Sequence, residues 1–175
     1  MTEATVRSKA DQSLTAGRTF FCCLSASFPS QFTSPSSRRD SAMALEIHNV
    51  GMKVGDTLKI KGKISDDANR FSLNLGNNSE NIALHFNPRF DDVADGAVIV
   101  CNSKCDSCWD SEQRESIFPF ARGEKFKLHI TLKEDTFEVT LPNDSTIEFP
   151  NRLSLDTINF LSVDGDVKLV SFGCK

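Results

Sequence analysis

The chain has 175 residues, a length typical of a single domain with a real hydrophobic core. Its hydrophobic share of 39% and charged share of 25% are those of an ordinary soluble globular protein. The net charge of −4 predicts no basic surface and so argues against nucleic acid or anionic lipid as a partner. No stretch approaches the roughly 18 apolar residues of a membrane span, so we expect no membrane insertion.

The first 42 residues differ in composition from the rest of the chain. They contain nine Ser and five Thr and keep no sustained helical or strand periodicity. Such sequence buries too little apolar area to offset the entropy of ordering it. We therefore expect a disordered extension over residues 1–42 and one folded domain over 43–175. The apolar run Thr19–Leu24 is short and lies between polar residues, which makes it a poor secretory signal.

The cysteines indicate thiols rather than a disulfide framework. They are Cys22, Cys23, Cys101, Cys105, Cys108 and Cys174, without the regularly spaced pairs of small secreted domains. Cys105 and Cys108 have the C-x-x-C spacing, with Cys101 nearby, but a zinc site needs a fourth ligand, and His85 and His129 are distant in the sequence. We expect two exposed thiols that are open to oxidation, with no metal site and no cofactor.

From Leu45 onward the sequence has the pattern of short strands. Apolar and polar residues alternate over Thr57–Ile64, Phe71–Leu75, Lys125–Leu132, Phe137–Leu141 and Val167–Phe172. Turn sequences separate these segments at Gly76–Ser79, Lys133–Asp135, Pro142–Asp144 and Asp164–Asp166. No window of ten or more residues keeps a helical period. With about eleven strand candidates, the pattern predicts an all-β fold, a two-sheet antiparallel sandwich or jelly roll.

The segment Leu84–Phe90 is the most informative. Since alternate side chains of a strand face opposite sides, it has one apolar and one polar face. The apolar face consists of Leu84, Phe86 and Phe90, and the polar face of His85, Asn87 and Arg89. The three polar groups follow one another at steps of about 7 Å. Pro88 cannot donate a ladder hydrogen bond, which predicts an edge strand or a local irregularity.

A second polar group follows it. The short strand Val98–Asn102 ends in an amide, and Trp109, Glu112 and Arg114 lie within six residues of one another. Tryptophan offers a flat apolar surface for the C–H face of a sugar, while imidazole, amide and guanidinium groups bind its hydroxyls. A lone strand histidine is more often structural, and an Arg–Glu pair is usually a surface ion pair of little energy. The combination nevertheless favours a neutral sugar such as galactose.

These residues form a long motif, His85-x-Asn87-x-Arg89, Val100-x-Asn102 and Trp109-x-x-Glu112-x-Arg114, which resembles the signature of the galectin family over residues 45–175. The resemblance implies a jelly roll that binds β-galactosides without calcium. It places His85, Asn87 and Arg89 around the galactose C4 hydroxyl, Asn102 and Glu112 near C6 and the neighbouring sugar, and Trp109 under galactose. It also implies that Arg114 orders Glu112 and reaches the second sugar, while Asp95 orients an arginine.

The resemblance is to the single-domain, dimerising galectins. It implies a homodimer formed through the terminal strands, around Leu45–Val50 and Val167–Phe172, that cross-links glycans on glycoproteins and glycolipids. It also implies a protein that is cytoplasmic and extracellular and is exported without a signal peptide. Many close members carry a histidine where this chain has Val93, which leaves the preference beyond galactose open.

The sequence leaves two alternative functions, a glycosidase and a protein-interaction module. A glycosidase would use Glu112 and Asp95, but arginine neighbours lower the pKa of a carboxyl group, the wrong direction for a general acid. We therefore expect no catalytic residues. The second alternative is an intracellular protein-interaction module on the same fold with secondary sugar binding. The acidic residues Asp91, Asp92 and Asp95 lack the ligand spacing of a calcium loop and are expected to serve a turn and an arginine partner.

Overall fold

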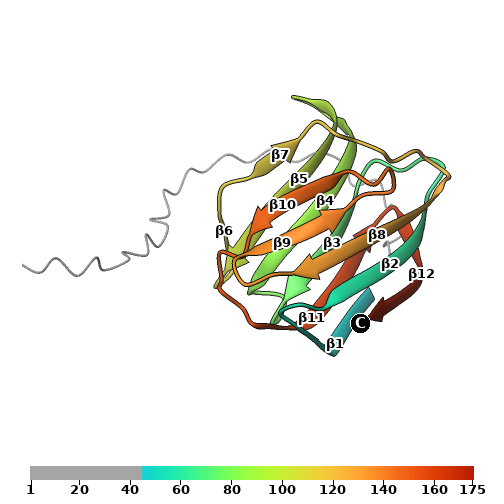
Figure 1. Cartoon of the computed structure of the whole chain (residues 1–175). Coiled ribbons are helices and arrows are strands. Elements are labelled where there is room, and N and C mark those ends of the chain that lie inside the picture. The colour runs from blue at the N-terminus through green and yellow to red at the C-terminus, as the bar shows by residue number, and fades with distance from the viewer. Residues whose placement is uncertain (1–44) are drawn as a thin grey trace, which may run out of the picture. The chain divides into compact units, whose positions relative to one another are not determined.

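The structure, a computed structural model, describes residues 45–175 (Figure 1). They form twelve strands: β1 (Leu45–Lys53), β2 (Thr57–Ile64), β3 (Phe71–Gly76), β4 (Ile82–Asp92), β5 (Gly96–Cys105), β6 (Cys108–Trp109), β7 (Gln113–Glu115), β8 (Lys125–Leu132), β9 (Thr136–Thr140), β10 (Thr146–Pro150), β11 (Thr157–Gly165) and β12 (Val167–Cys174). This described part contains no helix long and apolar enough to cross a membrane. The predicted extension over residues 1–42 and the run Thr19–Leu24 lie outside the described residues.

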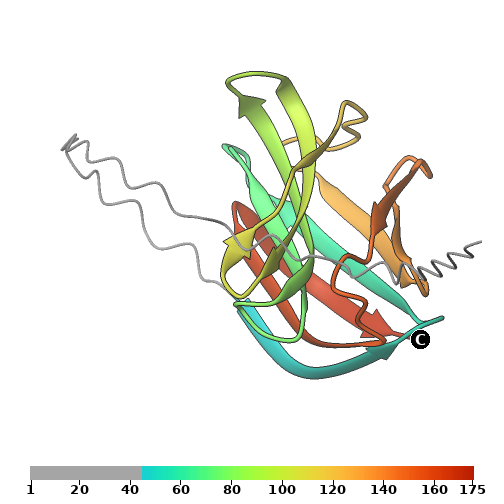
Figure 2. The ribbon, with the colours of Figure 1, turned by 90° about the vertical axis from the view of Figure 1, so that its left-hand side faces the viewer.

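The strands form two antiparallel sheets that pack face to face (Figures 1 and 2). The seven-stranded sheet has the order β1-β11-β3-β4-β5-β6, and β7 also pairs with β5. The five-stranded sheet has the order β10-β9-β8-β2-β12. The predicted all-β, two-sheet antiparallel jelly-roll sandwich is therefore confirmed.

The core lies between the two sheets and follows from the alternation of apolar residues. On β2, for example, Leu58, Ile60 and Ile64 are buried while the residues between them point outward. Gly62 occupies the remaining inward position, where a Cβ atom would lie 2.6 Å from the ring of Phe126. A larger residue at position 62 would therefore displace a core aromatic ring.

The two terminal strands are the open edges of the sandwich. β1 ends the seven-stranded sheet and β12 ends the five-stranded sheet. They lie near one another at one side of the molecule (Figures 1 and 2). Large apolar side chains remain exposed there, including Leu45 (41%), Val170 (60%) and Phe172 (45%). The described domain thus has unpaired backbone groups and apolar surface at the same edge.

The outer side of the five-stranded sheet carries a cluster of lysines, called here the basic face. Its members are Lys59, Lys61 and Lys63 on β2, Lys125 and Lys127 on β8, and Lys168 on β12. The expectation that a net charge of −4 leaves no basic surface is therefore wrong. Net charge is a sum over the chain and does not report how strand pairing distributes the charges.

Candidate functional site

The polar row predicted on β4 lies beside the second polar group on the adjacent strands. In the β4–β5 ladder His85 stands directly opposite Asn102, so their side chains share one face of the seven-stranded sheet. They open into a hollow of about 550 Å³, called here the polar groove. It is lined by His85, Asn87, Arg89, Asn102, Trp109 and Glu112, together with Arg70, Phe71, Ser72, Asp110, Asp164 and Gly165. Six of the seven predicted binding residues thus meet in one place, while Arg114 lies behind Glu112.

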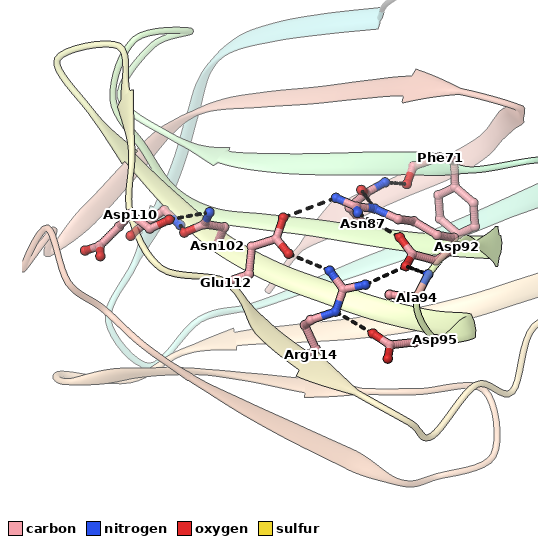
Figure 3. Close-up of polar contacts among 11 residues, drawn as sticks. Phe71, Asn87, Asp92, Ala94, Asp95, Asn102, Asp110, Glu112 and Arg114 are labelled. Carbon is pink, nitrogen blue, oxygen red and sulfur yellow. Dashed lines mark hydrogen bonds and ion pairs between the residues drawn. The ribbon is translucent and has the colours of Figure 1, made fainter. Parts of the chain in front are cut away.

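Two arginines and two carboxylates form a closed ring beside the groove (Figure 3). Arg89 reaches Asp92 with Nη1 (3.0 Å) and Glu112 with Nη2 (3.4 Å). Arg114 reaches the other oxygens of the same carboxylates, Glu112 at 2.6 Å and Asp92 at 2.7 Å, and its Nε donates to Asp95 at 2.6 Å. Each guanidinium bridges the two carboxylates through separate nitrogens, and these charge-assisted hydrogen bonds fix the orientation of its plane. The ring therefore holds both Arg89 and Glu112 rigidly at the groove wall.

Asp92 is the member of this ring that was not predicted as a site residue. It has the dual role expected of the loop aspartates, since its Oδ1 also accepts the backbone N–H of Ala94 at the turn. The hydrogen bond from Arg89 and that from Ala94 lower the pKa of Asp92 below its usual value. Hydrogen bonds to Asp95 and Glu112 raise the pKa of Arg114. Asp92 and Arg114 therefore keep their charges at neutral pH.

His85 is held by a relay of hydrogen bonds from the neighbouring strands. Asn74 Nδ2 donates to Ser162 Oγ (2.8 Å) and to Asp164 Oδ2 (3.2 Å), which turns Asn74 Oδ1 toward His85 Nδ1 at 2.5 Å. A carboxylate only accepts, so this amide orientation is forced and Nδ1 must carry the imidazole proton. Burial, with the nearby charge of Arg89, lowers the pKa of His85 to about 4. The neutral ring therefore presents Nε2 to the groove as an acceptor.

Asn87 replaces a backbone hydrogen bond that Pro88 cannot make. The N–H of Phe90 donates to the carbonyl of Asn69. The corresponding donor two residues earlier on β4 would be the backbone nitrogen of Pro88, which carries no hydrogen. There the side chain Nδ2 of Asn87 donates to the carbonyl of Phe71 at 2.6 Å. β4 lies between β3 and β5, so the expectation of an edge strand is wrong, and the alternative of a local irregularity is confirmed. The same amide accepts Nε of Arg89 on its oxygen at 2.8 Å, which fixes its orientation.

Trp109 forms the apolar wall of the groove. A two-residue turn at Asp106 and Ser107, both with positive φ, sends the chain back along β5 and places Trp109 opposite Lys104. The indole ring is 46% exposed, and its centroid lies 4.7 Å from that of the His85 ring. The Nζ of Lys104 lies 5.1 Å from the indole centroid. A flat apolar surface is thus held at the groove edge next to the polar row.

Asn102 is largely occupied by the chain itself. Its Nδ2 donates to the carbonyl of Asp110 at 2.8 Å, and its Oδ1 accepts the backbone N–H of Ser103. Arg152 Nη1 supports the same loop through the carbonyl of Ser111 at 2.9 Å. One N–H of Asn102 remains for a ligand. Asn102 therefore holds the loop after Trp109 in addition to lining the groove.

Several residues in or behind the groove were missed because they come from other parts of the chain. Asn74 and Ser162 lie behind His85, on β3, which pairs with β4, and on β11, which pairs with β3. Arg70 lines the groove, and within residues 45–175 its guanidinium forms no ion pair. Val93 is fully exposed in the β4–β5 loop. Only the alternation of β3, in which Asn74 stands between the core residues Leu73 and Leu75, could have indicated this residue from the sequence.

The cysteines and loop aspartates form no metal centre in the described part of the chain. Cys101 is buried in the core, whereas Cys105 and Cys108 are exposed on either side of the β5–β6 turn. Among residues 45–175 no group of three or more His, Cys, Asp or Glu side chains is placed to hold a metal ion.

The family model for galactoside-binding lectins matches residues 43–174. The chain belongs to this family. It is 44% identical to galectin-1 of Capra hircus over 128 residues, covering 73% of this chain and 95% of that protein. It is 47% identical to galectin-2 of Sus scrofa over 121 residues, with 69% and 95% covered. The resemblance to galectins is therefore confirmed.

Solved galectin structures have the same fold. The crystal structure of chicken galectin 2 is 45% identical, with a TM-score of 0.71, and the match covers 74% of this chain and 97% of that one. A homodimeric agglutinin from chicken liver is 39% identical, with a TM-score of 0.72 and coverage of 76% and 100%. The sandwich of this galectin is thus that of its relatives.

Proposed function

We propose that this galectin binds β-galactoside-containing glycans in the polar groove, without a metal ion and without catalysing a reaction. The observation that carries the proposal is the position of the exposed Trp109 ring beside the polar row of β4. A galactose ring has one apolar C–H face and an axial C4 hydroxyl. An aromatic wall next to a row of hydrogen-bonding groups matches that shape.

The hydrogen-bonding capacities at the row match one hydroxyl group. His85 Nε2 accepts, because Nδ1 carries the proton and binds Asn74. Asn87 Nδ2 has a second N–H beyond the one given to Phe71, and Arg89 keeps unused N–H groups on both Nη atoms. A hydroxyl donates one hydrogen bond and accepts two. The C4 hydroxyl of galactose would donate to His85 and accept from Asn87 and Arg89.

The remaining residues have roles around that contact. Trp109 would stack under the C–H face, and Asn102 and Glu112 would take the C6 side and the neighbouring sugar. Arg114 would hold Glu112 and reach the second sugar, with Asp95 orienting Arg114. The first test is retention of the full chain on immobilised lactose and elution by free lactose. Flow-through of correctly folded protein would refute the proposal.

The geometry of Glu112 argues for binding rather than hydrolysis. Each of its oxygens accepts from an arginine, Arg89 on one side and Arg114 on the other. A general acid needs a proton to give to the leaving group, whereas both oxygens of Glu112 are engaged as hydrogen-bond acceptors. Incubation with a chromogenic galactoside should release no product. Release that disappears in a Glu112→Gln variant would instead indicate a glycosidase.

The edge strands β1 and β12 support a homodimer with two distant grooves. Both strands are open, and both expose large apolar side chains such as Leu45 and Val170. One solved relative is described as a homodimeric agglutinin. Two weak sites on one particle gain avidity of roughly 10²–10⁴ and can cross-link glycoproteins and glycolipids. Such a role requires display outside the cell, and we propose a cytoplasmic and extracellular protein exported without a signal peptide.

Sedimentation of the full chain and of a variant that begins at Met43 tests this assembly. A dimer at micromolar concentration is expected for both forms. A monomer in both, together with failure to agglutinate red cells, would rule out cross-linking and leave monovalent binding. A dimer only in the Met43 form would show that residues 1–42 hinder the interface.

A further inference from the structure

The basic face brings lysines from separate strands into direct register. In the β2–β8 ladder Lys61 stands opposite Lys127, and Lys63 stands opposite Lys125. In the β2–β12 ladder Lys168 also stands opposite Lys63. Residues directly opposite one another share a face of the sheet, with Cβ atoms about 5 Å apart. The six lysines therefore form rows of like charge across the outer surface of β12, β2 and β8.

None of the six lysines forms an ion pair within the described residues; the outward carboxylates of the same sheet, Glu138 and Glu148, lie on β9 and β10, where they pair with Lys133. The ion pairs within residues 45–175 involve Lys133 and several arginines but none of the six lysines. Like charges placed directly opposite one another destabilise a sheet. Burial, together with the nearby Lys127 and Lys59, lowers the pKa of the outward His129 more than Asp144 raises it. In a chain of net charge −4, the face is a local concentration of positive charge.

We propose that the basic face binds a linear sulfated polysaccharide, separately from the polar groove. The strand positions that carry the lysines recur about every 7 Å along each strand and about 5 Å across strands, so an extended chain of anionic groups can meet several lysines together. Lysine binds such groups as a point charge and does not require the bidentate geometry of arginine. Binding would also relieve the repulsion between facing lysines.

The composition of the face favours a polysaccharide over other polyanions. The outward residues of β2 and β8 are threonines, lysines and His129, with no Phe or Trp on which nucleic-acid bases could stack. Nor do these two strands present an exposed apolar side chain that could enter a lipid surface; the exposed Val170 and Phe172 lie on β12, at the open edge proposed for the dimer. Charge complementarity to a hydrophilic chain is the property that remains.

The basic face and the polar groove lie on opposite sides of the sandwich. The groove opens on the outer side of the seven-stranded sheet, the lysines project from the outer side of the five-stranded sheet, and the core fills the space between them. One chain can thus hold a galactoside and a sulfated polysaccharide at the same time. This inference does not depend on what the groove binds.

Heparin is a suitable probe, with the full chain titrated in buffers of increasing salt concentration. We expect binding that weakens steeply with salt and is unaffected by lactose. The double variant Lys61→Gln/Lys127→Gln should lose at least fivefold in affinity and reduce the salt slope by roughly two charges. Its thermal midpoint should stay equal or rise, because a repulsive pair is removed, which separates lost binding from unfolding.

The matched control is Lys53→Gln/Lys133→Gln, which removes the same charge. Lys53 lies on β1, and Lys133 already pairs with Glu138, so heparin affinity should stay within twofold of the unchanged protein. An equal loss in both double variants would mean that only net charge matters and would overturn the site. Absence of binding at physiological salt, or tighter binding of single-stranded DNA of equal charge, would also overturn it.

The three histidines allow each surface to be followed separately by NMR. His129 lies on the basic face, His85 in the groove and His48 on the edge strand β1. Heparin should shift the imidazole signals of His129 and leave those of His85 unchanged, whereas lactose should do the reverse. Heparin shifts confined to His85 or His48 would place the polyanion elsewhere and refute the proposal.

Discussion

Asn74 Oδ1 lies 2.5 Å from Nδ1 of His85, and this contact determines which imidazole nitrogen faces the polar groove. The amide cannot turn around, because its Nδ2 is held by the carboxylate of Asp164 and the hydroxyl of Ser162. A residue outside the recognised motif therefore sets the hydrogen-bonding character of one inside it. The single N–H of the neutral His85 ring is on Nδ1 and donates to Asn74 Oδ1, so Nε2 is left as an acceptor.

Replacing Asn74 should weaken galactoside binding without any direct loss of a sugar contact. In Asn74→Ala the imidazole is free to rotate and to carry its proton on Nε2, where it would oppose a donating hydroxyl. We expect lactose affinity to fall about tenfold, equivalent to about 1.4 kcal/mol. Ser162→Ala, which leaves the Asn74–His85 contact and the Asp164 contact intact, should lose much less. Calorimetric titration with equal affinities for Asn74→Ala and the unchanged protein would refute the relay.

Lactose affinity should be flat from pH 8 to pH 5. Burial and Arg89 hold the pKa of His85 at about 4, so the ring stays neutral over that range. The lowered pKa of Asp92 keeps its carboxylate charged as well. As the pH approaches 4, protonation of Nε2 removes the acceptor and affinity should fall. A decline centred near the ordinary histidine value of about 6.5 would show that His85 is not shielded in this way.

Asp92 and Asp95 should differ in their effect on binding, although neither lines the groove. Asp92 contacts both Arg89 and Arg114, whereas Asp95 contacts Arg114 alone. Asp92→Ala frees the guanidinium that meets the sugar and should reduce lactose affinity by tenfold or more. Asp95→Ala should cost only a few-fold, because Arg114 keeps Glu112 and Asp92 as partners. The reverse ranking of the two variants in a titration would contradict the closed ring.

Galactoside binding should survive chelation by EDTA. The loop carboxylates that could attract a cation are occupied, Asp91 by Arg122, Asp92 by Arg89 and Arg114, and Asp95 by Arg114. The contacts proposed for the sugar are hydrogen bonds and stacking, which need no ion. Titration in EDTA and in calcium should give the same affinity. A loss in EDTA that calcium restores would show that these aspartates form a cation site.

The strand pattern predicted the sandwich and one face of the groove. Alternation over Leu84–Phe90 correctly separated core residues from the outward row of His85, Asn87 and Arg89, because the period of two is a property of a single strand. The loop motif placed Trp109 and Glu112 beside that row, since β5 and β6 follow β4 directly in the chain and in the sheet.

The order of the strands in the sheets determines contacts that the pattern within a single strand could not predict. Asn74 contacts His85 because β3 neighbours β4, and Asp164 lines the groove from β11, the strand beyond β3; the sequence does not specify which strands become neighbours. The basic face arose in the same way. The lysines of β2 and β8 were visible as outward positions, but only the pairing of Lys61 with Lys127 makes them a cluster. The expectation that Pro88 marks an edge strand was wrong for the same reason, because the strand order places β4 between β3 and β5.

The most direct test of the proposed groove is calorimetric titration of lactose into the unchanged protein and into Trp109→Leu and Arg89→Ala. Trp109 supplies the stacking surface. Removing Arg89 takes away its hydrogen bonds to the sugar and leaves one oxygen of Asp92 and one of Glu112 without the guanidinium, a cost of about 2–5 kcal/mol, although Arg114 still contacts both carboxylates. We predict one site per chain in the unchanged protein and no measurable binding in either variant, with far-ultraviolet circular dichroism unchanged. Near-normal lactose binding by either folded variant would contradict the placement of the galactoside in this groove.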